Sequence, residues 1–179
     1  MKKLSPTTRL TITAMAAALG VLFMYASSII PSGKLALLFL ASVVLWIPLN
    51  ERGGVPFAFL CYIATGLLSL LLIPNKLYPL SYALFFGIYG FIKLGVDNLV
   101  HDRIIAFVLK LLIMNALAAV LIWLGGLIVK QDVFSLLPEF PLYAIIIAME
   151  LAFIVYELVY TFCIGFFDAR LRDLIIPRK

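Results

Sequence analysis

The sequence predicts an all-α integral membrane protein, a bundle of six transmembrane helices with both termini in the cytoplasm. Of its 179 residues, 65% are hydrophobic and only 13% are charged, and the mean hydropathy is +1.16. This composition lies far outside that of soluble domains. A bilayer core of about 30 Å takes roughly 20 apolar residues per helix, which leaves room for at most about six or seven crossings. We therefore expect a single membrane domain over residues 1–179, without a fused ATPase or nucleic-acid module.

Proline, glycine and charged residues separate the first three apolar runs. The first expected helix, at about 8–30, ends before Pro31. The second, at about 35–49, ends before the polar segment Asn50–Gly54 and is short for a bilayer. The third spans about 55–73 and ends at a proline and an asparagine, which are turn-forming residues.

Three further runs complete the bundle. The fourth expected helix, at about 77–92, precedes Lys93–Arg103, the longest polar stretch inside the chain. The fifth covers about 104–129 and the sixth about 142–167. An even number of crossings places both termini on one side of the membrane.

The distribution of basic residues indicates which side that is. Three lie in the segments expected outside, namely Lys34, Lys76 and Lys130. Ten lie in the other segments: Lys2, Lys3, Arg9, Arg52, Lys93, Arg103, Arg170, Arg172, Arg178 and Lys179. Cytoplasmic loops carry the excess of lysine and arginine. The sequence thus predicts that both termini are cytoplasmic.

Two carboxylates in the sixth helix are candidate functional groups, because ionisable residues at membrane depth face protein or water. Glu150 and Glu157 are seven residues apart, on one face that Tyr143 extends outward. One interpretation is the polar wall of a substrate or proton site. The other is a pair of protonated or hydrogen-bonded structural carboxylates.

Other polar side chains fall in the fifth helix and at the expected outer surface. Asn115 either lines a pocket or forms an interhelical hydrogen bond, and Lys110 is expected to extend its ammonium group to the inner interface. The outer group contains Lys34, Asn75, Lys76, Tyr78, Tyr82 and Trp123. Tyrosine and tryptophan there are typical of an aromatic belt, but beside polar groups they are also what an outward-facing pocket needs.

The sequence contains no constellation typical of an enzyme. It has no HExxH, GxSxG, P-loop or GxGxxG motif. Asp97, His101 and Asp102 form a poor metal-ligand set, and a solvated, partly helical loop is the simpler interpretation. We expect no catalytic residue, no bound metal and no cofactor.

The first helix carries small residues four apart, Ala14 and Ala18, in the segment Thr11-Ile12-Thr13-Ala14-Met15-Ala16-Ala17-Ala18-Leu19-Gly20. Such spacing lets another helix approach the backbone closely. With six expected helices, a basic N-terminus and an arginine-rich C-terminal tail, the chain resembles the substrate-binding S component of energy-coupling factor (ECF) transporters.

This resemblance implies high-affinity capture of a vitamin or related micronutrient from outside the cell. The subunit would dock through an AxxxA motif, here Ala14 and Ala18, on a transmembrane coupling protein, and two cytoplasmic ATPases would use the ATP. The family's pocket lies toward the outside. The region that matches it here contains Lys34, Asn75, Lys76, Tyr78, Tyr82, Asn115, Trp123, Tyr143 and Glu150. No substrate fingerprint identifies the cargo.

Two other functions fit the same residues. One is a structural subunit of a cell-envelope complex, similar to the rod-shape protein MreD, in which Glu150 and Asn115 would pack dry between helices. The other is a proton-coupled permease that acts alone, with Glu150 and Glu157 as the proton relay. No nucleic-acid partner is expected in any of the three cases.

Overall fold

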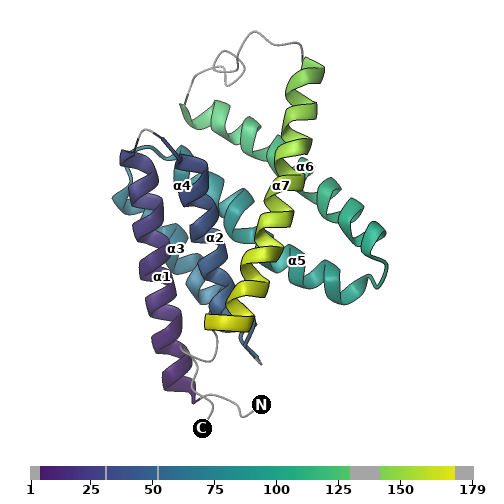
Figure 1. Cartoon of the computed structure of the whole chain (residues 1–179). Helices are drawn as coiled ribbons and strands as arrows, with labels where there is room; N and C mark the ends of the chain where they lie inside the picture. The colour runs from purple at the N-terminus through teal and green to yellow at the C-terminus, as the bar shows by residue number, and fades with distance from the viewer. Residues whose placement is uncertain (1–4, 31, 52, 130–141, 172–179) are drawn as a thin grey trace. The chain divides into compact units, whose positions relative to one another are not determined.

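The computed structural model describes residues 5–30, 32–51, 53–129 and 142–171. Within these ranges all regular structure is helical, which confirms the predicted all-helical class (Figure 1). Five helical segments are long and apolar enough to cross a membrane: Pro6–Ile29, Val55–Leu72, Leu77–Leu99, Arg103–Leu124 and Ile146–Phe166. Lys34–Leu49 is apolar but shorter. By the length and composition of its helices, the chain is a multi-pass membrane protein.

The helices follow the predicted order along the chain. They are α1 (Pro6–Ile29), α2 (Lys34–Leu49), α3 (Val55–Leu72), α4 (Leu77–Ser81), the π-helical η1 (Tyr82–Phe86), α5 (Gly87–Leu99), α6 (Arg103–Val129), α7 (Leu142–Phe166) and the π-helical η3 (Phe167–Leu171). Most bounds lie within two residues of those expected. The sixth crossing and the cytoplasmic termini stay predictions.

The fourth expected helix does not end near Ile92, as its charges suggested, but continues through α5 to Leu99. Lys93 and Asp97 do not terminate it, because they are one helical turn apart and their side chains form an ion pair of 3.6 Å. Asp97 therefore belongs to a helix and not to a solvated loop.

Local sequence signals explain where the helices begin. Ser5 caps α1, since its Oγ accepts the backbone N–H of Thr8 at 3.2 Å, and Pro6 occupies the first turn. Asp102 caps α6 in the same way, with Oδ1 accepting the N–H of Ile104 at 2.8 Å. These caps satisfy backbone donors that a helix start leaves unpaired.

The chain divides into two compact units, Leu4–Val133 and a second one that contains Phe134–Lys179. The first, which we name the α1–α6 unit, packs α1 against α2 and α3, and α2 also against α5. Helix α6 packs against α4, η1 and α5. The second, the α7 unit, contributes α7 and η3 to the described residues.

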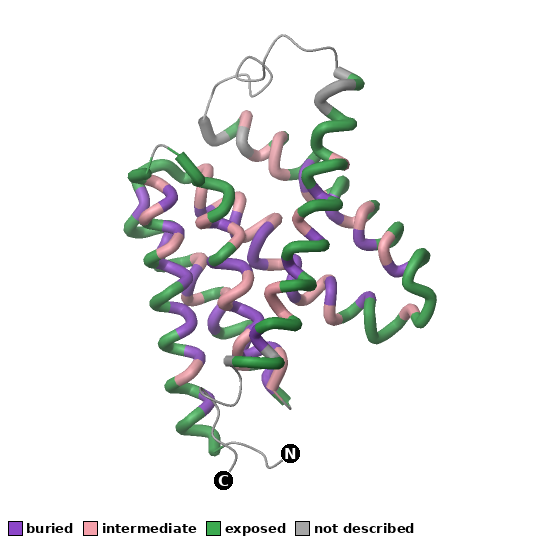
Figure 2. The backbone as a smooth tube through the Cα atoms, viewed as in Figure 1, coloured by how far each residue is buried: buried purple, intermediate pink, exposed green. Residues whose placement is uncertain are grey.

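The core of the α1–α6 unit is built from small side chains. Ala16 and Ala17 of α1 pack with Leu45 of α2 and Cys61 of α3. Gly20 lies so close to α3 that a Cβ there would be 3.0 Å from Cγ2 of Thr65. Small residues of this kind let membrane helices approach one another closely. Figure 2 shows the result as short buried and exposed stretches that alternate along α1.

Candidate functional site

The α1–α6 unit gathers polar side chains at two opposite ends. At one end, which the charge distribution predicts to be outside, Lys34 begins α2 and its Nζ lies 5.8 Å from the ring centroid of Tyr78. A lysine at that distance is attracted to the ring face. The structure thus brings together two residues of the predicted substrate region that are far apart in the sequence.

Asn75 and Lys76 lie at the same end, where both support the backbone of the α3–α4 connection. The Lys76 ammonium donates to the carbonyl oxygens of Leu70 and Ile73, at 2.6 and 2.9 Å. Asn75 Oδ1 accepts the N–H of Leu77 at 3.1 Å. A lysine on the last carbonyls of a helix is a common C-terminal cap, so these two side chains shape the rim of this end.

Tyr82 has a different environment, since only 1% of its surface is exposed. Its ring stacks on that of Tyr62, with centroids 6.0 Å apart and planes at 29°. Tyr82, the first residue of η1, is thus a core residue and does not line an open surface.

The remaining predicted substrate residues lie on α6 and α7. Asn115 and Trp123 of α6 are both exposed, Trp123 by 65%. On α7, Tyr143 is exposed by 69% and Glu150 is half-buried. These two share a face of α7 in the separate α7 unit, as their seven-residue spacing predicts. Glu157 continues that face and is 7% exposed.

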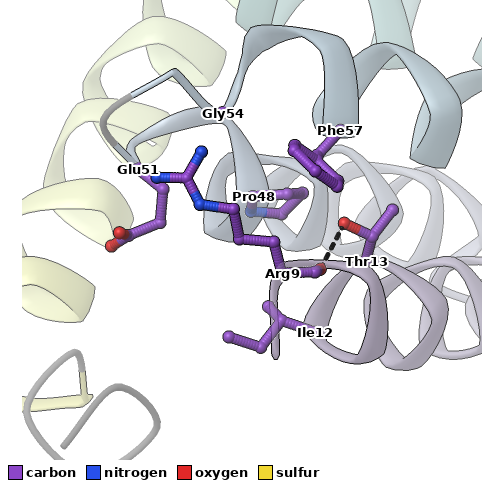
Figure 3. A pocket seen from close by; sticks show the side chains of 7 residues that line it. All are labelled: Arg9, Ile12, Thr13, Pro48, Glu51, Gly54 and Phe57. Carbon is purple, nitrogen blue, oxygen red and sulfur yellow. Dashed lines mark hydrogen bonds between the residues drawn. The ribbon is translucent and has the colours of Figure 1, made fainter. Parts of the chain in front are cut away.

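At the opposite, predicted inner end, Arg9 fastens the start of α1 to the α2–α3 turn (Figure 3). The side chain is only 7% exposed, and its Nη1 donates to the carbonyl of Gly53 at 3.2 Å. The guanidinium also lies 5.7 Å from the ring centroid of Phe57. Gly53 has a φ of 68°, a left-handed conformation that glycine adopts without strain.

A small cavity of about 10 Å³ adjoins this arginine, close to the least space that holds one water molecule. Its lining is drawn in Figure 3 and consists of Arg9, Ile12, Thr13, Pro48, Glu51, Gly54 and Phe57. Gly54 is required for the tight turn, because a Cβ there would be 2.0 Å from the carbonyl oxygen of Pro48. The cavity is too small for a vitamin and belongs to a structural anchor.

A second polar cluster joins α5 and α6. Lys110 was expected to extend toward the interface, but its Nζ donates to Asp97 Oδ1 at 3.0 Å and the residue is only 5% exposed. Lys93 approaches the other carboxylate oxygen, at 3.6 Å. One aspartate therefore bridges two lysines on adjacent helices and ties α5 to α6.

Helix α1 presents two faces of small residues. Ala16, Ala17 and Gly20 are buried, whereas Ala14 and Ala18 are exposed. The exposed row continues in steps of three and four residues along α1: Thr7, Thr11, Ala14, Ala18, Leu22, Tyr25 and Ile29. The predicted docking motif thus lies on a face of α1 that the other helices of the α1–α6 unit leave exposed.

The chain matches no family model, no curated protein and no solved structure. Its function is therefore inferred from the placement of its own side chains. Two features matter most for that inference, the open face of α1 and the polar end that contains Lys34 and Tyr78.

Proposed function

We propose that this chain is the substrate-capture subunit of an ECF-type transporter that imports a small water-soluble vitamin or related micronutrient. It binds the solute at the outer surface of the bacterial cytoplasmic membrane. It then delivers the solute by docking on a transmembrane coupling protein, which two cytoplasmic ATPases energise. The chain itself has no catalytic role in this proposal.

The observation that carries the proposal is the outward orientation of Ala14 and Ala18. Ala14 and Ala18 are four residues apart on an exposed face of α1 that also carries the larger side chains of Leu10, Met15 and Leu22. In a bilayer there is no hydrophobic drive to bring helices together, so close van der Waals packing over small residues provides much of the attraction. A pair of exposed small residues is therefore suited to packing against a helix of another subunit.

The buried face of α1 supports the interpretation that Ala14 and Ala18 bind another protein. If the alanines served only to pack the subunit itself, the pair expected from the motif would be buried. Instead α2 and α3 pack on Ala16 and Ala17, and the helices of the α1–α6 unit leave the other pair exposed. The exposed pair is therefore available to the coupling protein.

For solute capture we propose, within the α1–α6 unit, the residues of the polar outer end. Lys34 and Tyr78 supply a cation and a flat ring, the kind of groups that orient a small ligand. Asn75 and Lys76 form the rim. Asn115 and Trp123 are the candidates on α6, while the burial of Tyr82 gives it a supporting role. Tyr143 and Glu150 are separate candidates in the α7 unit.

The decisive experiment is purification of the tagged protein from its native host in mild detergent, followed by mass spectrometry of the small molecules and proteins that accompany it. We expect a stoichiometric micronutrient that raises the melting temperature when it is added back. We also expect a membrane coupling subunit and two ATPases.

Other outcomes would contradict the proposal. An empty protein that brings down cell-envelope assembly proteins would indicate a scaffold. Uptake by the purified protein alone in liposomes, driven by a proton gradient, would indicate a permease with Glu150 and Glu157 as its relay.

A further inference from the structure

The fourth membrane segment is interrupted by a π-helical turn. Helix α4 passes into η1 and then into α5 without a break in the chain. At the junction the backbone N–H of Gly87 donates to the carbonyl of Tyr82, five residues earlier. In a regular α-helix that N–H would bond to the carbonyl of Ala83. The π-helical turn therefore removes from Ala83 the donor that an α-helix would provide.

Side chains from two neighbouring helices bond to the carbonyls of this turn. The hydroxyl of Tyr62, on α3, donates to the Ala83 carbonyl at 2.7 Å. The hydroxyl of Ser42, on α2, donates to the carbonyl of Phe86. Backbone polar groups inside a membrane need a hydrogen-bond partner. The Ala83 carbonyl does not receive the Gly87 N–H in the π-helical turn, and the Tyr62 hydroxyl is its donor instead.

Packing around the turn favours the same arrangement. The Tyr62 ring stacks on that of Tyr82, the first residue of η1. A Cβ on Gly87 would lie 2.9 Å from atoms of both rings. The stack of the two tyrosine rings beside the turn therefore requires a glycine here.

We propose that η1 is a register switch, in which the Tyr62 and Ser42 hydroxyls hold the fourth segment in its π-helical state. In the alternative state the Gly87 N–H bonds to Ala83 and displaces the Tyr62 hydroxyl. The π-helical turn holds one residue more than an α-helical turn. When the turn becomes α-helical, α5 rotates relative to α4 by about 100° and shifts by about 1.5 Å along the axis, which are the rotation and the rise of one helical residue. π-Helical turns are often found at functional positions in helices.

The rest of the α1–α6 unit determines what such a switch moves. Helix α6 packs on the fourth segment, and Lys110 joins it to Asp97 of α5 at 3.0 Å. Helices α2 and α3 carry the two hydroxyls and pack against α1. The switch therefore turns α5 relative to α4 and to α2, on which α5 packs, and acts on α6 through the bond between Lys110 and Asp97. This inference does not depend on the proposed function.

Spin-label distances in the full-length protein in lipid nanodiscs test the proposal. The labels are attached at Leu10→Cys on α1 and Leu99→Cys on α5, because both positions are exposed, by 52% and 81%. Cys163 is replaced by alanine, while Cys61 is buried and stays in place. We expect one distance population when both hydroxyls are present.

The test variant is Tyr62→Phe, which removes the hydroxyl and keeps the stacked ring. We expect a second distance population, at least about a tenth of the total and displaced by more than about 5 Å, since labels lie at the rim of a helix about 10–12 Å across. Tyr25→Phe, on the exposed face of α1, is the matched control and should retain one population.

Ser42→Ala provides an independent second variant and is expected to give the same additional population. It decides the question if Tyr62→Phe does not yield a monodisperse protein. A single unchanged distance population in every variant that folds would overturn the register switch, and so would an equal second population in Tyr25→Phe.

Discussion

The two faces of α1 both carry small residues, but these residues have different surroundings. On one face Ala16, Ala17 and Gly20 are covered by α2 and α3. On the other face Ala14 and Ala18 are open. Both faces would let a helix approach closely, but within the α1–α6 unit only one of them is covered by other helices. The residues of the covered face thus pack the helices of the unit together, while those of the open face are accessible to another protein.

This contrast predicts that bulky substitutions on the covered face lower the stability of the protein, whereas those on the open face lower solute uptake. Bulk added to the covered face has to displace α2 or α3, and tightly packed interiors resist such displacement. Bulk added to the open face displaces only lipid, unless a partner binds there. The two faces can therefore be tested with the same substitution at neighbouring positions.

The largest effect is expected for Ala16→Trp, on the covered face. Ala16 is 3% exposed and packs with Leu45 and Cys61, so an indole ring has no space there. We expect destabilisation of about 3 kcal/mol or more, seen as loss of monodisperse protein in size-exclusion chromatography. A wild-type elution profile and melting temperature would show that this face is not tightly packed.

Next in size is the effect of Ala14→Trp or Ala18→Trp on uptake. The purified variants should fold and bind solute as the wild type does, while uptake in cells falls at least about tenfold, the change that about 1.4 kcal/mol of lost docking free energy gives. Radiolabelled uptake and binding to the purified protein are measured side by side. Undiminished uptake by both variants would remove the docking role of this face.

A smaller effect is expected for Gly20→Ala, on the covered face. The added Cβ would be 3.0 Å from Cγ2 of Thr65, a cost that the better helix propensity of alanine, about 1 kcal/mol, offsets in part. We expect a net loss of about 1 kcal/mol in thermal unfolding. Thr65→Ser removes that methyl group and should restore stability to the double variant, whereas additive losses would argue against this contact.

The smallest effect is expected for Leu22→Ala, on the open face. Leu22 is 62% exposed, so truncation should change stability by no more than about 0.5 kcal/mol. Uptake should also stay near wild type, because the smaller side chain does not obstruct a helix that approaches Ala18. A large loss of stability would mean that the open face is packed in the folded subunit.

The sequence was most informative about the helices, because their boundaries depend on local signals. Pro31 and Gly33 separate α1 from α2, and the glycine turn before Val55 separates α2 from α3. The one substantial error was the end of the fourth helix. Lys93 was interpreted as a stop, but its pairing with Asp97 allows the helix to continue to Leu99.

Candidate site residues were harder to predict, because their roles depend on which helices meet. The contact of Lys34 with Tyr78 joins the start of α2 to α4, and no local sequence pattern predicts it. The anchoring role of Arg9 and the bond of Tyr62 to Ala83 are likewise tertiary. Gly87, next to a run of aromatic residues, was the one local signal that could have indicated the π-helical turn.

The outward role of Ala14 and Ala18 depends on the same kind of information. The sequence contains several small residues in α1, and spacing alone does not say which pair faces the core. The structure assigns Ala16 and Ala17 to the core and leaves the predicted pair exposed. That this open pair binds a coupling protein is the central claim.

Affinity purification of the tagged wild type and of Ala18→Trp from the native host, with quantitative mass spectrometry of the accompanying membrane proteins, tests that claim most directly. We predict that a coupling subunit and two ATPases accompany the wild type and are depleted at least about tenfold from Ala18→Trp, while Leu22→Ala retains them. Equal recovery of those subunits with Ala18→Trp, or their absence from the wild type, would contradict the account.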